Sequence, residues 1–397
     1  MASNKLIFFL VLFTISIASS ASTTSITTAN KLSSFNVVKF GAKADGKTDS
    51  TGAFSKAWAA ACNSLSPPRL YVPRGTYLIK RLELRGPCKS TSRTTVQIDG
   101  TLVAPSDYRQ LGNSGNLLLF IKISGLSVIG GTIDARGAAY WGCTRNCPPG
   151  ARSITFNNVR NLVVSGLMLI NSQVSHMVIS GCTNAVVSGV KIRAPDQSPN
   201  TDGIHIQTST GVTIKDSAIR TGDDCISIGP GTKKLFIQGI SCGPGHGISI
   251  GSLARDVKEE GVEDVTVKNV SFSGSDNGLR IKSWARPSNG YVRGVTYHDI
   301  TMNNVKNPII IDQRYCPEGR GCPNQSSGIK ISQVTYRNIR GTSATPVAVN
   351  FQCSATNPCI GIRLQNVKLG YSNSGAKSSC VHAHGTSSGV VAPASCF

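Results

Sequence analysis

The sequence has few aromatic residues, few acidic residues and, beyond its first residues, no long apolar run. Phe, Trp and Tyr make up 6% of the 397 residues, and 41 Lys and Arg stand against only 20 Asp and Glu. No later segment approaches the roughly 20 apolar residues that a membrane-spanning helix requires. Scarce aromatics and the lack of a dense Lys/Arg run argue against a nucleic-acid partner, because single-strand binding uses stacked aromatic side chains.

The first residues have the composition of an export signal. Lys5 precedes an apolar run from Leu6 to Phe13, and small residues follow as far as Ala21. That run is too short to cross a bilayer. We therefore expect residues 1–21 to be a signal peptide, residues 22–34 a flexible lead-in and residues 35–397 a single domain. The mature protein is expected to be secreted to the cell exterior or cell wall, without a membrane anchor and as a monomer.

Thirteen cysteines follow this segment, and export would place them where disulfides persist. Four pairs are close in sequence and are predicted to be disulfides: Cys225 with Cys242, Cys316 with Cys322, Cys353 with Cys359, and Cys380 with Cys396. The odd count leaves one thiol, which we assign to Cys182. Cys143 and Cys147 loosely fit a zinc-ligand spacing, but nothing near them completes four ligands, so no metal is expected.

The excess of basic residues, with a formal charge of +21, indicates a polyanionic partner. Because nucleic acid is disfavoured and export is predicted, an acidic polysaccharide is the simplest choice. Net charge could also serve solubility alone. Sequons at Asn269 and Asn324 fit a secreted glycoprotein.

A nine-residue repeat sets the expected fold. The pattern x-φ-x-φ-x-x-φ-x-φ, in which φ is mostly apolar, recurs with starts 23 to 34 residues apart. The repeats begin at Asn161, Asn184, Gly211, Lys234, Asp264, Gly294, Gly328 and Gly361. Each contains two short alternating stretches, which is the periodicity of strands. One coil cannot bury its apolar face alone, so the pattern predicts an all-β stack, a right-handed parallel β-helix. The amphipathic segment Thr51 to Cys62 is its expected N-terminal capping helix.

A second strand in successive repeats carries polar residues at matching positions. These strands read Asp202-Gly-Ile-His-Ile206, Asp224-Cys-Ile-Ser-Ile228, His246-Gly-Ile-Ser-Ile250 and Asn277-Gly-Leu-Arg-Ile281. The intervals from Asp202 to Asp224 and from Asp224 to His246 are both 22 residues. Equal intervals predict side chains stacked on neighbouring strands, about 4.8 Å apart.

Asp223, next to Asp224, adds a third acid to this column. Three of only 20 acids at one place in a basic chain favour a reactive site over a solvated turn. Like charges held together push their pKa values apart, so that one acid stays protonated while its neighbours are ionised. Glycosidic hydrolysis needs this combination, because one carboxylic acid protonates the leaving oxygen and a carboxylate activates water.

Arg280 and Lys282 are expected to point outward beside the acids, since Leu279 and Ile281 take the inward positions of the same strand. The two cations could form ion pairs with the acids or hold a carboxylate of the substrate. His246, within the column, is placed to tune an aspartate or to contact a sugar hydroxyl.

Four segments together resemble the signature of a known family. In chain order they are Asn200-Thr201-Asp202, Gly222-Asp223-Asp224, Gly245-His246-Gly247 and Arg280-Ile281-Lys282. They resemble those of the family 28 glycoside hydrolases, the polygalacturonases, and the similarity extends from Phe35 to the C-terminal cysteines. The resemblance implies a pectin-lyase-like solenoid with no cofactor.

The resemblance also implies roles for individual residues. Asp223 would be the general acid, supported by His246, while Asp202 and Asp224 would bind and activate water. The substrate-binding residues would be Arg280, Lys282, Tyr315 and Asn200.

The implied reaction is hydrolysis of α-1,4 bonds in de-esterified pectin, with inversion at the anomeric carbon. Overall similarity is greatest to the pollen-type exopolygalacturonases, which implies attack from the non-reducing end. An endo-acting enzyme, a calcium-dependent pectate lyase and a non-catalytic pectin-binding wall protein are the alternatives.

Overall fold

The computed structural model describes residues 1–2, 32–111, 113–372 and 375–397. All but the first two residues of the predicted signal peptide, and most of the predicted lead-in, lie outside these residues. The folded unit begins at Leu32 and ends at Phe397. Its first strand starts at Ser33, two residues before the predicted boundary, because residues 33–36 pair in parallel with residues 68–71. Within the described ranges, no helix is long and apolar enough to span a membrane.

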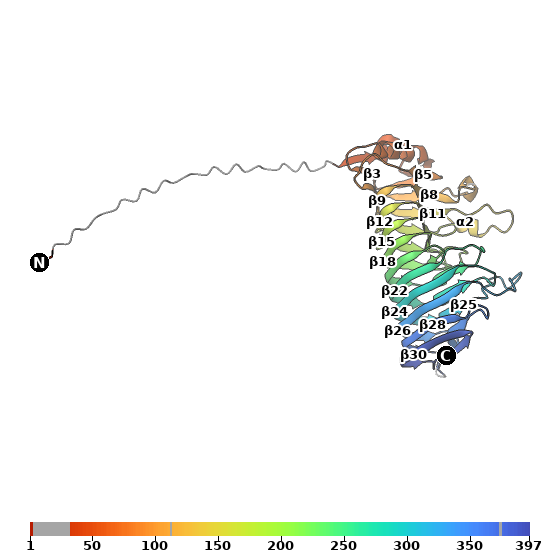
Figure 1. The fold of residues 1–397 in the computed structure, drawn as a ribbon. Coiled ribbons are helices and arrows are strands. Elements are labelled where there is room, and N and C mark those ends of the chain that lie inside the picture. The colour runs from red at the N-terminus through yellow and green to blue at the C-terminus, as the bar shows by residue number, and fades with distance from the viewer. Residues whose placement is uncertain (3–31, 112, 373–374) are drawn as a thin grey trace. The chain divides into compact units, whose positions relative to one another are not determined.

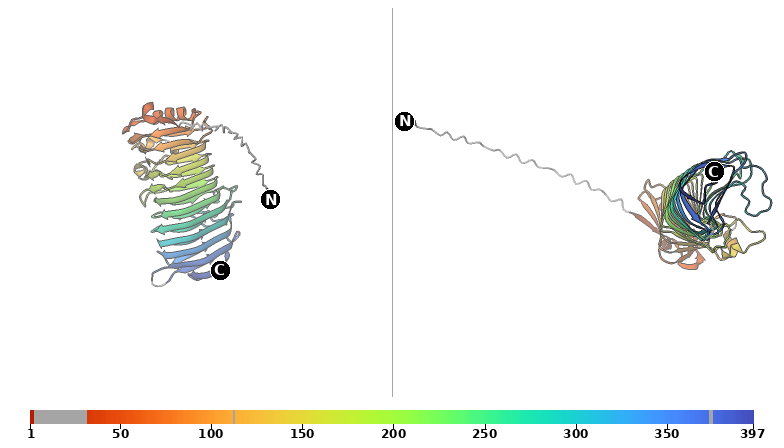
Figure 2. Two further views of the ribbon diagram at one scale, coloured as in Figure 1. Left: turned by 90° about the vertical axis from the view of Figure 1, so that its left-hand side faces the viewer. Right: turned by 90° about the horizontal axis from the view of Figure 1, so that it is seen from below.

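The strands of this unit form two parallel sheets, and successive coils stack along one axis (Figures 1 and 2). The 19-stranded sheet contains β1 Ser33–Asn36, β2 Asp45–Asp49, β3 Pro68–Val72, β4 Thr76–Leu78, β6 Thr94–Ile98, β7 Thr101–Val103, β9 Ser124–Ile129, β10 Thr132–Asp134, β12 Arg160–Ser165, β13 Met168–Ile170, β15 Thr183–Ser188, β16 Lys191–Arg193, β18 Thr210–Arg220, β20 Lys233–Cys242, β22 Val262–Ser273, β24 Tyr291–Val305, β26 Lys330–Ser343, β28 Cys359–Gly370 and β30 Ala383–Ala392. The 11-stranded sheet contains β5 Leu82–Arg85, β8 Asn116–Ile121, β11 Arg152–Asn157, β14 Met177–Ser180, β17 Ile204–Gln207, β19 Ile226–Ile228, β21 Ile248–Leu253, β23 Asn277–Ser283, β25 Asn307–Asp312, β27 Val347–Gln352 and β29 Lys377–Val381. The predicted right-handed parallel β-helix is therefore confirmed.

Four helical segments accompany the sheets: α1 Thr51–Cys62, α2 Ala138–Trp141, and the 3₁₀ turns η1 Val37–Phe40 and η2 Tyr108–Leu111. Helix α1 has the predicted bounds and lies at the N-terminal end of the stack (Figure 1). Its Phe54, Ala57 and Trp58 are buried, and the Trp58 indole Nε1 donates to the carbonyl of Arg85 at 3.0 Å. The helix thus covers apolar surface that the first coils would otherwise expose, which is the role of a cap.

The first residue of each nine-residue repeat sits at a bend in the coil. Its backbone φ lies between 52° and 71° in seven of the eight predicted repeats, beginning with Asn161 and Asn184. Left-handed backbone favours Gly, Asn and Asp over other residues. This preference explains why those types recur at the start of the pattern.

One predicted repeat, starting at Gly328, is wrong. The pairing of β24 with β26 places Gln333, with a φ of 55°, opposite Gly294. The true repeat ends at Gly341, where the pattern calls for an apolar side chain. A Cβ at Gly341 would lie 1.8 Å from the carbonyl oxygen of Met302, so only glycine fits there. The residues from Gly328 to Gln333 also alternate between apolar and other side chains, so the nine-residue pattern was matched there in the wrong register.

The register of the 11-stranded sheet follows the predicted 22-residue interval. Ile204 pairs with Ile226, Ile226 with Ile248, and Ile248 with Leu279. All four side chains are fully buried. A slip by one residue would turn this apolar ladder outward, so burial locks the register and with it the position of the polar residues on the outer face.

Six disulfides are present in the described residues, including all four predicted pairs. Cys143 and Cys147 form a fifth, so their spacing belongs to a disulfide and not to a zinc site. The sixth joins Cys62 at the end of α1 to Cys88. Cys182 is free and buried, as predicted.

Candidate active site

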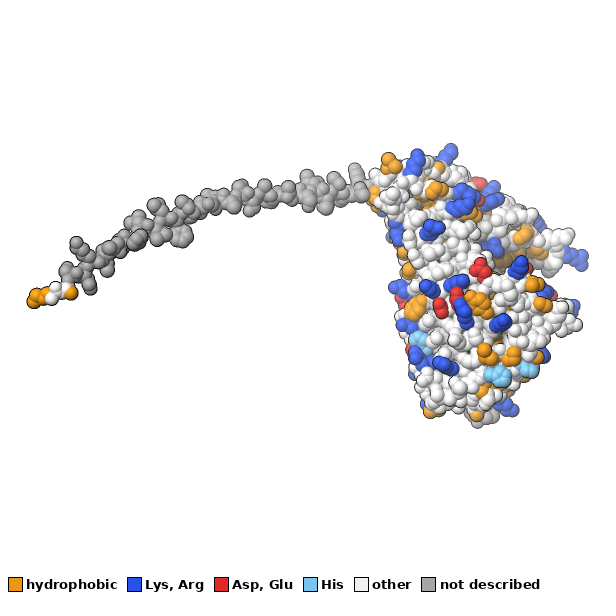
Figure 3. Space-filling model, viewed as in Figure 1, with side chains coloured by type: hydrophobic (Ala, Val, Ile, Leu, Met, Phe, Trp, Pro, Cys, Tyr) orange, Lys and Arg blue, Asp and Glu red, His pale blue; other side chains and the backbone are white. Residues whose placement is uncertain are grey.

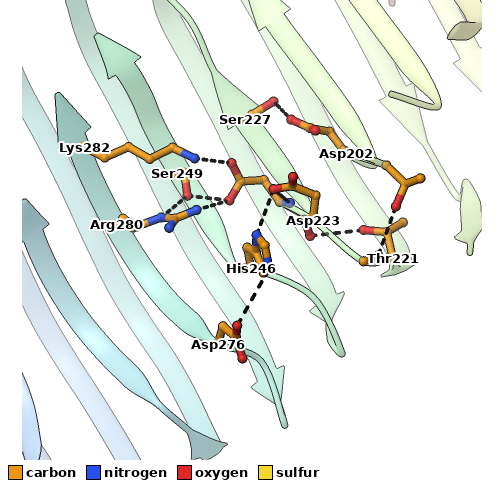
Figure 4. A network of polar contacts seen from close by, with 12 residues as sticks. Asp202, Thr221, Asp223, Ser227, His246, Ser249, Asp276, Arg280 and Lys282 are labelled. Carbon is orange, nitrogen blue, oxygen red and sulfur yellow. Dashed lines mark hydrogen bonds and ion pairs between the residues drawn. The ribbon is translucent and has the colours of Figure 1, made fainter. Parts of the chain in front are cut away.

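The three predicted acids and His246 lie together on the outer face of the 11-stranded sheet (Figure 4). Asp202 precedes β17, Asp224 precedes β19 and His246 precedes β21, each two residues before the register-locking apolar residue of its strand. Backbone bonds join the coils at this point, since the Gly203 amide donates to the Asp224 carbonyl at 2.9 Å. The predicted column is therefore present.

Asp224 is the most deeply buried of the three acids, with 2% of the residue exposed. Its Oδ1 accepts from Ser249 Oγ and from Arg280 Nη2, both at 2.7 Å, and its Oδ2 accepts from Lys282 Nζ at 2.9 Å. Burial alone would raise the pKa of Asp224, but Lys282 and Arg280 outweigh burial and lower it to about 2. Asp224 is therefore a carboxylate at any pH at which the protein would work.

Arg280 and Lys282 alternate outward from the core as predicted, but they are buried, at 9% and 6% exposure. In the free protein they form ion pairs with Asp224, which is one of the two possibilities that the sequence left open. The ring of Tyr315 covers both cations, with its centroid 5.0 Å from Lys282 Nζ and 5.9 Å from Arg280 Cζ. Cation–π contact of this kind attracts the cations to the face of the ring.

Asp202 differs from Asp224 because no Lys or Arg among the described residues forms an ion pair with it. Its Oδ2 lies 2.5 Å from the hydroxyl of Ser227. Burial, with smaller contributions from the charges of Asp223 and Asp224, raises the pKa of Asp202 to about 7. The pKa values of two carboxyls on neighbouring coils are thus displaced in opposite directions, mainly by burial at Asp202 and by the two cations at Asp224, and the mutual repulsion expected from the sequence is a smaller contribution.

Asp223 is held by His246, whose Nδ1 lies 2.9 Å from Asp223 Oδ1. The same Oδ1 accepts from the backbone amide of Asp224 at 2.7 Å. The hydrogen bond to Asp223 raises the pKa of His246 against the opposing effect of burial. On its other side, His246 Nε2 is 3.8 Å from Asp276 Oδ2. The histidine therefore contacts an aspartate, as one of the two roles considered for it requires.

A cleft of about 480 Å³ opens over this network. Six of the predicted site residues line it: Asn200, Asp202, Asp223, Asp224, Lys282 and Tyr315. His246 and Arg280 contact the cleft's acids from the side.

Sequence reasoning missed several residues of the site, chiefly His205, Ser227, Ser249, Asp276 and Trp284. Three of them occupy the outward position between the two isoleucines of the aligned strands, which was a usable signal. Asp276 precedes Asn277 as Asp223 precedes Asp224, so the same alignment could have found it. Trp284, whose ring centroid is 5.2 Å from that of Tyr315, carried no such signal.

The carboxyls of Asp223 and Asp224 and a ring nitrogen of His246 lie within 4.8 Å of one another, close enough to hold a metal ion. Both oxygens of Asp224, however, already bond to the two cations. A divalent ion would have to displace or face these charges, so the donor set fits a metal poorly.

Comparison with known proteins matches residues 62–396 to the Glycosyl hydrolases family 28. The chain belongs to glycoside hydrolase family 28. A polygalacturonase of Prunus persica is 52% identical to this hydrolase over the full length of both chains. An exopolygalacturonase of Zea mays is 40% identical, over 92% of this chain and 90% of its own.

Solved structures agree with this fold. An endo-xylogalacturonan hydrolase from Aspergillus tubingensis superimposes on the hydrolase with a TM-score of 0.76, at 24% identity, over 91% of this chain and all of the other. A polygalacturonase from Erwinia carotovora gives 0.69 at 25% identity, over 89% of this chain and 96% of its own. The resemblance inferred from four short segments is thereby confirmed at the level of family and fold.

Proposed function

We propose that this hydrolase cleaves the α-1,4 bonds of de-esterified pectin. The observation that carries the proposal is the set of three neighbouring carboxyls in different electrostatic surroundings, with two cations and a tyrosine at their side. The polygalacturonase names of its relatives, from Prunus persica and Zea mays, support the same substrate. Lys and Arg side chains spread over the face shown in Figure 3, where acidic ones are few, so the surface suits a polyanion.

Asp223 is the proposed general acid. Its side chain is 20% exposed in the cleft, whereas that of Asp224 is 2% exposed, so Asp223 has better access to a leaving oxygen. His246 holds it through Oδ1. Asp202 and Asp224, on neighbouring coils, are proposed to bind and activate the attacking water between them.

Arg280, Lys282, Tyr315 and Asn200 are proposed to bind the galacturonate unit. The hydrogen bonds of Arg280 use Nε and Nη2, so Nη1 is the group that we assign to a substrate carboxylate. Lys282 has three N–H donors, of which one reaches Asp224. These contacts would be charge-assisted and shielded from water by the Tyr315 ring.

Exo attack from the non-reducing end is the proposed mode, based on the overall similarity to pollen-type enzymes; the relatives carry both general and exo names. Pure protein with polygalacturonate in a chelator should release reducing ends and no unsaturated product that absorbs in the ultraviolet. Resolved by size, the first minutes should show galacturonate monomer. An early ladder of oligomers would establish endo action, ultraviolet-absorbing product would establish a lyase, and absence of new reducing ends would leave a binding protein.

Inversion at the anomeric carbon is the expected stereochemistry. Asp202 and Asp224 lie on strands about 4.8 Å apart, and a carboxyl pair at roughly 5 Å could by itself act in a retaining mechanism. A retaining scheme needs two carboxyls, however, and leaves the third without a task. If Asp202 and Asp224 share the water, Asp223 is left to donate the proton, and this division of tasks supports inversion even though oxygens of Asp223 and Asp224 lie within 4.8 Å of each other in the free protein. Proton NMR of the first turnovers should therefore show the β-anomer, and an initial α-anomer would refute these roles.

We further propose that the protein is secreted and acts as a monomer. Six disulfides in the described residues suit an oxidising compartment. Both sequon asparagines, Asn269 and Asn324, have exposed side chains and are proposed glycosylation sites.

A further inference from the structure

Asp202 is connected to a short chain of hydrogen bonds that the proposed mechanism does not use. From Asp202 Oδ2 the chain runs to Ser227 Oγ at 2.5 Å, then from Ser227 Oγ to His205 Nδ1 at 2.8 Å. It continues from His205 Nε2 to Gln207 Oε1 at 3.2 Å, and Gln207 Nε2 donates to Ser180 Oγ at 3.3 Å. Hydrogen bonds thus connect outward-facing side chains of three neighbouring strands, β14, β17 and β19.

The far end of the chain fixes the position of each proton. Since Gln207 donates through Nε2 to Ser180, its Oε1 faces His205 and accepts, so His205 Nε2 carries a proton. Burial lowers the pKa of His205, which keeps the ring neutral. A neutral ring protonated at Nε2 has a lone pair at Nδ1, and that lone pair accepts the Ser227 hydroxyl proton.

A serine hydroxyl has only one proton to donate. A carboxylate at Asp202 would accept from Ser227, and that hydrogen bond would lower the pKa of Asp202. Because His205 takes the hydroxyl proton instead, Asp202 can bond to Ser227 Oγ only by donating a proton of its own. We propose that Ser227 and His205 are positioning residues that keep Asp202 protonated in the free protein and thereby set the pH at which Asp202 becomes a base. This proposal rests on the proposed function of Asp202 in activating water.

The other charged groups near this chain are few among the described residues. Asp202 faces Asp223, Asp224 and Lys282, and His205 faces Asp224, Lys282 and, from β11, Arg152. His176, which precedes β14, bonds through Nδ1 to the backbone carbonyl of Asp202 and not to its carboxyl. Ser227 is therefore the one neutral group that decides the direction of the hydrogen bond at Asp202 Oδ2.

His205→Phe tests the proposal, because it removes the acceptor and keeps a ring of similar shape. Ser227 would then donate to the Asp202 carboxylate, and a hydrogen bond to the charged form favours ionisation. The acidic limb of kcat/KM against pH on polygalacturonate should move to lower pH by about one unit or more. In a Ser227→Ala background the same change should produce no shift, since His205 acts only through the hydroxyl.

Two matched variants complete the kinetic test. Ser227→Thr retains the hydroxyl and should retain the wild-type limb. Thr155→Val removes a hydroxyl from the same outward face, two coils from His205, and should leave the profile unchanged. An equal shift from His205→Phe in both backgrounds, or none in either, would overturn the proposal.

NMR tests the same chain of hydrogen bonds in the absence of substrate. Its outcome therefore distinguishes failure of this proposal from failure of the proposed function. Long-range ¹H–¹⁵N spectra should show His205 protonated at Nε2 only. Titration of the Asp202 carboxyl ¹³C shift should place its midpoint lower in His205→Phe than in wild type. Protonation of the His205 ring at Nδ1 would refute the assignment. So would an unchanged Asp202 midpoint in a His205→Phe variant that unfolds at the wild-type temperature. Both results would hold even if the protein did not cleave polygalacturonate.

Discussion

Asp223→Asn is expected to reduce turnover of polygalacturonate by about 10² to 10⁴, the usual contribution of general acid catalysis. Asp223 Oδ1 accepts from His246 Nδ1 and from the Asp224 amide, and an asparagine oxygen can accept both bonds. The variant should therefore fold normally and lack only the proton that the leaving oxygen requires. Initial rates of reducing-end release measure the loss, and thermal unfolding checks the fold.

Asp276→Asn is the matched control for this variant. Asp276 faces the opposite nitrogen of His246 at 3.8 Å, so the change also removes a carboxylate beside the histidine but leaves Asp223 intact. A loss of less than about tenfold is expected from Asp276→Asn, because the proposed acid remains in place. Retention of more than about a tenth of wild-type turnover by Asp223→Asn would rule out its role. If Asp202→Asn then proved the more damaging change, the raised pKa of Asp202 would mark that residue as the donor.

The strand register could be predicted from sequence because the coils around the site are equal in length. Two intervals of 22 residues place Asp202, Asp224 and His246 at matching positions, and the buried isoleucines between them fix those positions. The prediction failed where coil length changes. Near Gly328 the chain alternates for longer than one repeat, and the wrong register fits the apolar pattern better than the true one, which places Gly341 at an apolar position. The left-handed bend at Gln333 marks the true start, but the sequence does not reveal it, since glutamine rarely adopts that conformation.

The site was predicted less completely than the fold, because charge pairing and burial depend on side chains from distant coils. Arg280 and Lys282 were placed on the outer face of β23, which is where they lie. They are buried, however, and Tyr315, which lies beyond the next strand, places its ring against both cations. An outward position on one strand does not reveal what a later loop places over it. The contact with Asp224 likewise depends on side chains reaching across two coils.

Lys282→Met is expected to destabilise the protein by about 3–5 kcal/mol at neutral pH, which is typical when one partner of a buried ion pair is removed. Lys282 Nζ is the cation on Asp224 Oδ2, and both side chains are nearly inaccessible, at 7% and 2% exposure. Methionine fills similar space, so the loss would report the missing cation at Asp224 Oδ2 and not a cavity. Chemical denaturation at pH 7 measures it.

An exposed pair provides the control for this prediction. Lys233 lies 3.4 Å from Glu263 with 41% of its side chain exposed, and Lys233→Met should change stability by less than about 1 kcal/mol. Combining Lys282→Met with Asp224→Asn should add to the loss, because the second change takes from buried Arg280 its only ion-pair partner among the described residues. If Lys282→Met lowered the free energy of unfolding no more than Lys233→Met does, Arg280 alone would be enough to compensate the charge of Asp224.

The pH dependence of Lys282→Met tests the same cause independently. In wild type the pKa of Asp224 is lowered to about 2 from a model-compound value of 3.8, so its ion pairs contribute stability above pH 3.8 and lose it as the pH falls towards 2. Lys282 is the largest of the groups that lower the pKa of Asp224, so its loss leaves only Arg280 and Ser249 against burial, and we expect the folded-state pKa of Asp224 to rise above 3.8. A raised pKa reverses the sign, so the variant should lose stability as the pH rises above 3.8, while the wild-type contribution of Asp224 stays constant. The difference in free energy of unfolding between wild type and Lys282→Met should therefore be larger at pH 7 than at pH 4. An equal difference at both pH values would show that lost packing, not lost charge compensation, destabilises the variant.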